Sequence, residues 1–257
     1  MEIIDAIILG IIQGITEWLP ISSSGHLVIF QELFSVQVPV FYDIMLHLAT
    51  LIVILIVFNQ EIINILKSCI RWKKDRHFYL GLYILIGSFF TAVIGLLFKD
   101  LILPMFTSLL AVSIALIVTG ILLLLTKFVK LKREIKVKDS IIIGLVQGLA
   151  LIPGISRSGS TISTGLLLGI KREEIATFSF LLFIPAVIGA TILEYDSSFI
   201  VSDLIPVIIG MLITIIVGYV TLKFLLEIIK KQKFWVFSIY CFILATFLLI
   251  YLYLLPL

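Results

Sequence analysis

Long apolar runs are the feature that most restricts what this chain can fold into. A helix that crosses a bilayer needs about 20 consecutive, predominantly apolar residues. Six stretches approach or reach this length, at residues 41–58, 78–98, 104–125, 175–193, 204–225 and 234–255. With 61% hydrophobic and only 14% charged residues, and a mean hydropathy of +1.25, the chain cannot fold as a water-soluble globule. We predict an all-α polytopic membrane protein, a single membrane domain over residues 1–257.

Two further apolar segments are interrupted by polar residues and by breaks in the helical pattern. Residues 3–19 contain Gln13 and Glu17, and a proline followed by a Ser/Gly run then ends the pattern. Residues 141–170 contain a similar Pro/Gly/Ser break. Each segment is predicted to form a helix, a loop and a second short helix, from about His26 in the first copy, that enters the membrane and returns. Such irregular backbone is tolerated at membrane depth only where it is buried in protein or lines a wet cavity.

The two interrupted segments are copies of one another, offset by 134 positions. Glycine, glutamine and serine residues recur in the same order, so that Gly10, Gln13, Gly14, Ser22, Ser24 and Gly25 align with Gly144, Gln147, Gly148, Ser156, Ser158 and Gly159. The reactive positions differ, because Glu17 aligns with a leucine and Ser23 aligns with Arg157. The chain is therefore predicted to consist of two pseudo-symmetric halves, 1–130 and 131–257, each with one interrupted segment and three spans.

Lysine and arginine residues predict which side of the membrane each loop occupies. The segments 59–77, 126–139 and 223–233 carry five, six and four of them. The segments 98–103 and 194–203 carry one and none. Because basic loops remain in the cytoplasm, the first interrupted segment is predicted to enter from the outer face and the second from the inner face. This is an inverted-topology repeat, which typically places the functional site near the midplane where the discontinuous helices meet.

Glu17, His26 and Arg157 are ionisable residues that lie in these otherwise apolar segments. An ionised side chain in a membrane is unfavourable by about 2.5–3.5 kcal/mol on insertion scales unless it finds a partner or water, so Glu17, His26 and Arg157 need an explanation. One is a structural ion pair between Glu17 and Arg157 that pins the two halves together. The other is a buried phosphate site. The surrounding hydroxyl groups and glycines favour the second, because they supply donors and exposed backbone N–H groups that an ion pair does not need.

The same residues suit phosphoryl transfer, which needs charge neutralisation, an in-line nucleophile and help for the leaving group. Arg157 is predicted to bind phosphate oxygens through its planar donor fork, and Glu17 to hold a divalent cation, Mg²⁺ or Ca²⁺. Ser23 is the candidate nucleophile and His26 the candidate general acid or base. The predicted substrate-binding residues are Gln13, Ser22, Ser24, Gly154, Ser156, Ser158 and Thr161. Alternatively, His26 could cap or pack against a helix, and any single serine could be a cap or turn residue.

Both motifs resemble those of a known family. The stretch QGITEWLPISSSGH, from Gln13 to His26, resembles the (E/Q)xxxE motif and Ser-rich continuation of the undecaprenyl pyrophosphate phosphatases, the bacitracin-resistance proteins. PGISRSGST, at residues 153–161, resembles their PGxSRSxxT motif without a mismatch. The resemblance extends over the whole chain and implies a metal-dependent, multi-pass enzyme of the bacterial plasma membrane. It implies hydrolysis of undecaprenyl pyrophosphate to undecaprenyl phosphate and inorganic phosphate, which recycles the lipid carrier for cell-wall glycans.

The family's residue roles are carried over by position. Gln13 and Glu17 correspond to the acidic-motif pair, Ser23 and His26 to the nucleophile or base candidates, and Arg157 to the phosphate-binding arginine. Because the first motif position is glutamine here, Glu17 is the sole carboxylate of the motif. The implied partners are a polyprenyl pyrophosphate lipid and the membrane bilayer, with no nucleic acid, and a homodimer is left open.

Other functions and other polar residues stay open at this point. Inverted repeats are typical of secondary transporters, so the protein could be a transporter or flippase of polyprenyl phosphate, or a binder without catalysis. Asp43 and His47, four residues apart in the first span, could face the site or form an interhelical hydrogen bond.

Overall fold

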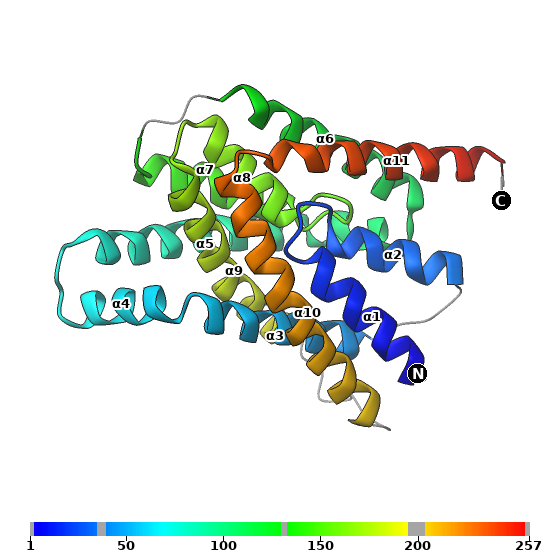
Figure 1. Cartoon of the computed structure of the whole chain (residues 1–257), viewed down its shortest axis with the longest axis horizontal. Helices are drawn as coiled ribbons and strands as arrows, with labels where there is room; N and C mark the ends of the chain where they lie inside the picture. The colour runs from blue at the N-terminus through cyan, green and yellow to red at the C-terminus, as the bar shows by residue number, and fades with distance from the viewer. Residues whose placement is uncertain (1–2, 35–39, 130–132, 195–203, 255–257) are drawn as a thin grey trace.

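The computed structural model describes residues 3–34, 40–129, 133–194 and 204–254. Within these ranges the regular elements are helices, accompanied by an isolated bridge between Arg133 and Ile170 (Figure 1). The first half contains α1 (Ile3–Thr16), α2 (Ser23–Phe34), α3 (Val40–Val57), α4 (Asn59–Ile70), α5 (Arg76–Ile102), the 3-10 helix η1 (Leu103–Thr107), α6 (Leu109–Leu125) and η2 (Thr126–Phe128). The second half contains α7 (Val137–Leu149), α8 (Arg157–Leu167), α9 (Arg172–Glu194), α10 (Leu204–Lys230), η3 (Phe234–Val236) and α11 (Phe237–Leu254).

Helix length and apolarity confirm the prediction of an all-α polytopic membrane protein. Among the described residues, five helical segments are long and apolar enough to cross a membrane, and α3 with α4 makes a sixth if the pair counts as one broken span. The span predicted over 41–58 corresponds to α3, and α4 follows it after a bend. The chain bends by 78° between α3 and α4, where the apolar run gives way to the polar residues Asn59, Gln60 and Glu61.

The span predicted over 104–125 begins later than expected. Pro104 lies in the first turn of η1, and α6 begins only after Ser108, whose Oγ accepts the Ala111 backbone N–H at 3.2 Å. Proline is tolerated in the first turn of a helix and not in its interior, and serine is a preferred N-cap. The chain therefore ends one helical segment and starts another at this point.

Three helix pairs form the main contacts of the bundle: α1 lies along α10, α7 along α5, and α6 along α11 (Figure 1). Small residues let the first two pairs approach closely. A methyl group added to Gly10 would lie 2.7 Å from a backbone oxygen of α10, and one added to Gly144 would collide with the backbone of α5. At the same crossings, Thr214 Oγ1 donates to the Gly10 carbonyl at 3.1 Å, and Thr91 Oγ1 donates to the Gly144 carbonyl at 3.0 Å. Both interrupted segments are thus fixed through their backbones.

Trp18 anchors the first interrupted segment in the core. Its side chain is fully buried, and its ring meets Phe180 and Phe183 of α9 edge to face, with ring centroids 6.0 and 5.8 Å apart. Such aromatic pairs contribute about 0.5–1.5 kcal/mol beyond the area that they bury. Because Trp18 directly follows Glu17, this packing also fixes the backbone that carries the carboxylate.

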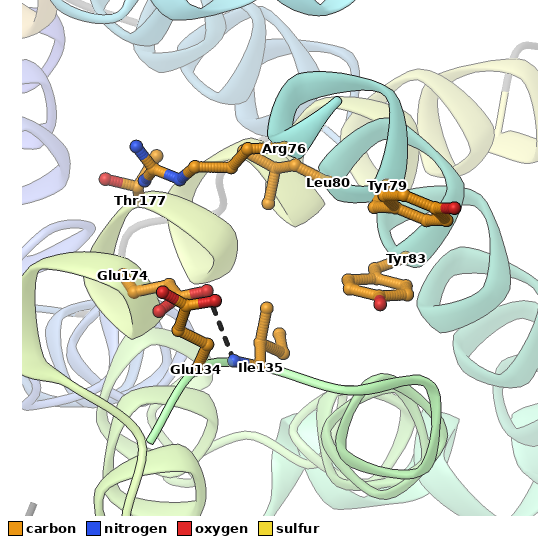
Figure 2. A pocket seen from close by; sticks show the side chains of 8 residues that line it. All are labelled: Arg76, Tyr79, Leu80, Tyr83, Glu134, Ile135, Glu174 and Thr177. Carbon is orange, nitrogen blue, oxygen red and sulfur yellow. Dashed lines mark hydrogen bonds between the residues drawn. The ribbon is translucent and has the colours of Figure 1, made fainter. Parts of the chain in front are cut away.

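A cavity of about 130 Å³ lies between the first turns of α5, residues 134–135 and the first turns of α9 (Figure 2). Its lining residues are Arg76, Tyr79, Leu80, Tyr83, Glu134, Ile135, Glu174 and Thr177. Glu174 accepts the Ile135 backbone N–H at 3.1 Å, so this carboxylate ties the segment before α7 to α9. None of the lining residues belongs to the two motifs, so the candidate site is built below from the motif residues themselves.

Candidate active site

The first motif lies where α1 ends. Gln13 and Glu17 are one turn apart, and the Glu17 N–H donates to the Gln13 carbonyl at 3.0 Å, so the chain stays helical up to Glu17. Pro20 then prevents the helix from continuing. Both polar side chains are buried, with Gln13 0% and Glu17 7% exposed. The four-residue spacing therefore places an amide and a carboxylate side by side in the interior.

Ser22 starts α2 earlier than the sequence predicted. Its φ of +69° reverses the chain, and its Oγ accepts the Gly25 backbone N–H at 3.2 Å, as an N-cap does. Helix α2 therefore begins at Ser23 and not near His26. A left-handed conformation at a non-glycine residue is unfavourable by about 1–3 kcal/mol and persists only where the surroundings fix it.

The second loop repeats this arrangement at the start of α8. Ser156 Oγ accepts the Gly159 backbone N–H at 3.1 Å and caps the helix. Gly154, with φ of +98°, takes the left-handed conformation that glycine adopts without steric cost. Arg157 is the first residue of α8, so the helix dipole and the guanidinium both favour negative charge at this point.

Hydrogen bonds join the two loops directly. The Gly154 N–H donates to Ser22 Oγ at 3.1 Å, and Ser158 Oγ donates to the Trp18 carbonyl at 3.0 Å. Thr119 of α6 supports the second loop, because its Oγ1 donates to the Gly154 carbonyl at 3.0 Å. These bonds satisfy buried polar groups of irregular backbone, as membrane depth requires.

Glu17 is the centre of the site, because three side chains converge on its carboxylate. Arg157 Nη2 donates to Oε1 at 2.6 Å. Ser23 Oγ donates to Oε2 at 2.6 Å, and Gln13 Nε2 donates to the same oxygen at 3.1 Å. The Arg157 guanidinium carbon also lies 3.8 Å from the ring centroid of Phe183, a cation–π contact. The structure thus brings together four of the predicted site residues, including the candidate nucleophile.

Two polar atoms of this cluster are buried without a hydrogen-bond partner, Arg157 Nη1 and Gln13 Oε1. Leaving such an atom unpaired is unfavourable by about 1–3 kcal/mol, and by more for a charged group. A bound ligand is one explanation for such atoms, although Gln147 Oε1, at the position equivalent to Gln13 in the second copy, is unpaired as well. The guanidinium nitrogen can donate to a phosphate oxygen. The amide oxygen, next to the Glu17 carboxylate, can accept a cation.

The oxygen atoms of the cluster fit the divalent cation that the sequence predicts. The Glu17 carboxylate, the Gln13 amide oxygen and the Ser23 hydroxyl are hard donors of the kind that Mg²⁺ and Ca²⁺ prefer. Among the described residues, no group of three or more His, Cys, Asp or Glu side chains could hold a metal ion. An ion held here would therefore also take ligands from phosphate oxygens and water, which is usual for Mg²⁺.

His26 contacts α11. Its Nδ1 donates to the Ser22 carbonyl at 2.7 Å, and its Nε2 accepts the Tyr240 hydroxyl proton at 2.7 Å. The two rings are stacked, with centroids 5.7 Å apart. This geometry corresponds to the alternative of a packing histidine, and the role of His26 as general acid or base stays a prediction.

The remaining hydroxyl groups of the predicted substrate site are bonded within the protein. Ser22 Oγ lies 3.3 Å from Ser24 Oγ, and Ser156 Oγ lies 3.4 Å from Ser158 Oγ. Thr161 Oγ1 donates to the carbonyl of the first α8 residue at 2.7 Å. These bonds correspond to the cap and turn roles left open for single serines, and contact of these residues with substrate stays a prediction.

Sequence reasoning did not assign two of the residues found at the cluster. His47 of α3 was left open, and its Nε2 lies 3.7 Å from Glu17 Oε2. Its only signal in the sequence is an ionisable side chain within an apolar span. Phe183, under the Arg157 guanidinium, carries no signal, because an aromatic residue in an apolar span cannot be told from a core residue.

These features define a class: a polytopic α-helical membrane protein with a buried Glu–Arg–Ser cluster where two interrupted helical segments meet. Residues 6–247 match the model of the family described as "Bacitracin resistance protein BacA". The chain belongs to this family.

Similar proteins carry one common name. The chain is 42% identical over 261 residues to an undecaprenyl-diphosphatase from Carboxydothermus hydrogenoformans, with 97% of each chain covered. It is 41% identical over 259 residues to proteins of the same name from Halothermothrix orenii and Korarchaeum cryptofilum, which covers 97% of this chain and 98% and 99% of theirs. The similarity is therefore not confined to the two motifs.

Proposed function

We propose that this chain hydrolyses undecaprenyl pyrophosphate to undecaprenyl phosphate and inorganic phosphate in the bacterial plasma membrane, recycling the cell-wall lipid carrier and conferring bacitracin resistance. The observation that carries the proposal is the convergence of Arg157 and Ser23 on the Glu17 carboxylate, with one guanidinium nitrogen still unpaired. The name undecaprenyl-diphosphatase, shared by the similar proteins, supports it.

The cluster contains the groups that this reaction needs. Arg157 Nη1 and the N-terminus of α8 hold oxygens of the terminal phosphate. Ser23 Oγ attacks the terminal phosphorus, and the bond from phosphorus to the bridging oxygen breaks, which releases undecaprenyl phosphate. The Ser23 proton passes to Glu17 Oε2, with which the hydroxyl already shares a 2.6 Å hydrogen bond. Water then hydrolyses the phosphoserine and releases inorganic phosphate.

One carboxylate suffices for this route. The Gln13 amide has no acidic proton to exchange and serves as a donor to Glu17 and as a neutral oxygen ligand. A divalent cation, Mg²⁺ or Ca²⁺, when bound, neutralises charge on the phosphate oxygens. The alternative route is direct attack by water. Hydrolysis by this route would continue after Ser23 is replaced, whereas hydrolysis by serine attack would stop.

We further propose that the two halves form an inverted repeat whose interrupted segments enter from opposite faces. Corresponding contacts support this. Gly10 and Gly144, which align in the two copies, each accept a threonine hydroxyl from a helix of the other half, Thr214 and Thr91 respectively. Each interrupted segment is thus held by the opposite half, as a two-fold relation requires.

The loop charges support the same topology. Five basic residues lie in the 59–77 segment, which follows α3. Four lie in the 223–233 segment, which contains the last turns of α10 and the residues after it. Residues 130–132 and 195–203 belong to the other loops used in the prediction and lie outside the described residues. With the basic loops in the cytoplasm, the pyrophosphate head would reach the cluster from the outer face.

Release of inorganic phosphate from undecaprenyl pyrophosphate by the detergent-purified protein tests the phosphatase proposal. We expect cation-dependent release from the wild type and none from Glu17→Gln or Arg157→Ala. Because Arg157→Ala leaves a buried carboxylate without its partner, Ser23→Ala is assayed beside it, with thermal unfolding and lipid binding as controls for folding. A folded wild type that binds the lipid and releases no phosphate contradicts the proposal.

Transport of polyprenyl phosphate is the second candidate, because meeting pairs of interrupted helices are typical of secondary transporters. A transporter continues to move lipid in Ser23→Ala, whereas hydrolysis by serine attack stops. Following a labelled polyprenyl phosphate across liposomes that contain the wild type or this variant separates the two functions. The homodimer stays a prediction.

A further inference from the structure

Two histidines of this chain share one local geometry but face different groups. His26 and His47 both donate Nδ1–H to the backbone carbonyl four residues earlier, at 2.7 and 2.9 Å. Because a carbonyl oxygen only accepts, these bonds assign the proton to Nδ1 and direct Nε2 away from the histidine's own helix. Nε2 of His26 meets Tyr240, whereas Nε2 of His47 lies 3.7 Å from Glu17 Oε2. His47 is therefore the histidine of the Glu17 cluster.

The separation between His47 Nε2 and Glu17 Oε2 matches a metal site better than a direct contact. At 3.7 Å it exceeds the roughly 2.7–3.2 Å of an N–H···O hydrogen bond. Metal–ligand bonds of about 2.0–2.2 Å place two ligand atoms about 3.3–3.8 Å apart at tetrahedral to trigonal angles. The right angles of an octahedral site place them about 3.0 Å apart, so an octahedral ion such as Mn²⁺ would draw the two atoms closer together. Arg157 occupies the other carboxylate oxygen, Oε1, so the two oxygens of Glu17 face an arginine and a histidine respectively.

Two other observations point to a cation at this position. Metal-binding histidines almost always donate their second ring N–H to a carbonyl or carboxylate, as His47 does to the Asp43 carbonyl. Independently, Gln13 Oε1 is fully buried beside Glu17 and has no hydrogen-bond partner. The Gln13 amide group and His47 Nε2 thus both lie next to Glu17 Oε2, at 3.1 and 3.7 Å.

We propose that His47 Nε2 is a ligand of the divalent cation at this site, together with the Glu17 carboxylate and the Gln13 amide oxygen. The inference rests on the proposed function, which assigns a cation to the phosphoryl-transfer site. One imidazole nitrogen among oxygen ligands favours Mn²⁺ or Co²⁺ over Mg²⁺ and Ca²⁺, which prefer oxygen ligands alone. His47 therefore shifts the metal preference expected from the motif carboxylate alone.

A second histidine–glutamate pair provides an internal control. His77 Nε2 also lies 3.7 Å from Glu61 Oε2. The cavity of about 270 Å³ next to His77 is lined by the basic residues Lys67, Arg71 and Lys73. These three positive charges outnumber the carboxylate of Asp75, which also lines the cavity, and oppose a divalent cation there. Distance alone therefore does not make a metal site, and His77 is expected to bind none.

Pulsed electron paramagnetic resonance of bound Mn²⁺ tests the proposal without any assay of activity. The full chain is purified in detergent with an affinity tag that contains no histidine, and Mn²⁺ is added at less than one equivalent. The chain has three histidines. We expect ¹⁴N modulation from a coordinated imidazole in the wild type, the same modulation in His77→Gln, and its loss in His47→Gln. Mn²⁺ affinity should fall about tenfold or more in His47→Gln, the lower end of what loss of a supporting contact to a metal site causes.

The outcomes separate this inference from the phosphatase proposal. Nitrogen modulation that disappears in a folded His47→Gln protein supports His47 as a ligand even if no phosphate is released from the lipid. Wild-type protein that binds no Mn²⁺, or binds it without nitrogen modulation, overturns the inference even if phosphate release is cation-dependent. Modulation that survives in His47→Gln and disappears in His77→Gln also overturns it. Thermal unfolding of each variant establishes that the loss of modulation is not a loss of fold.

Discussion

The two interrupted segments share one backbone arrangement but carry different reactive side chains. In both loops a serine caps the following helix by accepting the N–H of the glycine three residues later, Ser22 for Gly25 and Ser156 for Gly159. The position directly after the cap has diverged, since the first copy presents Ser23 and the second Arg157, whereas the next position is serine in both copies. A duplicated loop thus kept the residues that shape its backbone and divided the reactive side chains between its copies.

The largest effect is expected when Arg157 or Glu17 is replaced by the residue at the equivalent position of the other copy. Arg157→Ser and Glu17→Leu remove one side of the 2.6 Å ion pair and the group that binds phosphate or orients Ser23. We expect phosphate release to fall by at least about 10³-fold, the lower end of what a transition-state arginine contributes in phosphoryl transfer. The matched control is Leu151→Ala, at the position equivalent to Glu17, because Leu151 is 42% exposed and should keep wild-type turnover. Wild-type rates in Arg157→Ser would contradict the site.

Ser23→Ala sharpens the comparison by removing a single oxygen atom. Phosphate release should fall roughly a thousandfold or more, because loss of a nucleophile removes the whole covalent route. Ser88→Ala, on α5, removes a hydroxyl that donates to the Ile84 carbonyl and should leave the rate unchanged. A residual rate within about tenfold of wild type in Ser23→Ala would favour direct attack by water.

Alanine substitutions at Gly10 and Gly144, where α1 crosses α10 and α7 crosses α5, test whether the two interrupted segments are held equally tightly. Gly144→Ala should destabilise the protein by about 1–3 kcal/mol, because the added methyl group collides with the backbone of α5. Gly10→Ala should cost less, since its methyl group would lie 2.7 Å from a backbone oxygen of α10. Gly189→Ala, with no atom within 4 Å of the added carbon, is the control and should not destabilise the protein, because alanine is more favourable than glycine inside a helix by about 1 kcal/mol. Thermal unfolding in one detergent ranks the three variants.

The two caps should differ slightly in what they contribute to stability. Ser156→Ala removes one cap and should cost about 0.5–2 kcal/mol. Ser22→Ala should cost more, because Ser22 Oγ accepts the N–H groups of both Gly25 and Gly154, and both would be left buried and unpaired. Equal melting temperatures for the two variants would show that the bond between the loops adds nothing to the cap.

The smallest expected effect is on the pH dependence of stability. The α5 helix is capped by the Asp75 carboxylate, which titrates, whereas Ser22 and Ser156 cap through hydroxyl groups that do not. The Phe78 backbone N–H bonded to Asp75 holds the pKa of this partly exposed carboxyl below its usual value. A group whose pKa is lowered on folding adds stability above its usual pKa and loses that stability as pH falls through the lowered value. The melting-temperature advantage of the wild type over Asp75→Ser should therefore shrink between about pH 6 and pH 3. Ser156→Ala should show no such pH dependence relative to the wild type.

Length and apolarity predicted the spans, because crossing a bilayer depends on little else. The meeting of the two motifs also followed from the sequence, because they are copies that place a carboxylate and a guanidinium in apolar segments. The direct ion pair between Glu17 and Arg157 corresponds to the alternative that the sequence analysis weighed against a phosphate site. The bend after α3 and the late start of α6 did not follow from the sequence, because each depends on where a polar or proline residue ends a helix. The different surroundings of His26 and His47 could not be predicted at all. Both rings make the same local bond, and only the packing of α2 on α11 and of α3 beside α1 decides what each Nε2 meets.

The crossing of α1 with α10 sets an order for biogenesis. Gly10 and the Thr214 hydroxyl that binds its carbonyl are 204 residues apart, and Glu17 is 140 residues from Arg157. At synthesis rates of about 5–20 residues per second, the N-terminal hairpin waits about 10–40 s for α10 to emerge from the ribosome. At the same rates the Glu17 carboxylate lacks Arg157 for about 7–28 s, and the Gly10 carbonyl lacks Thr214 for the whole interval. A nascent chain that stalls after α6 has neither Arg157 nor α10 and therefore cannot form the site.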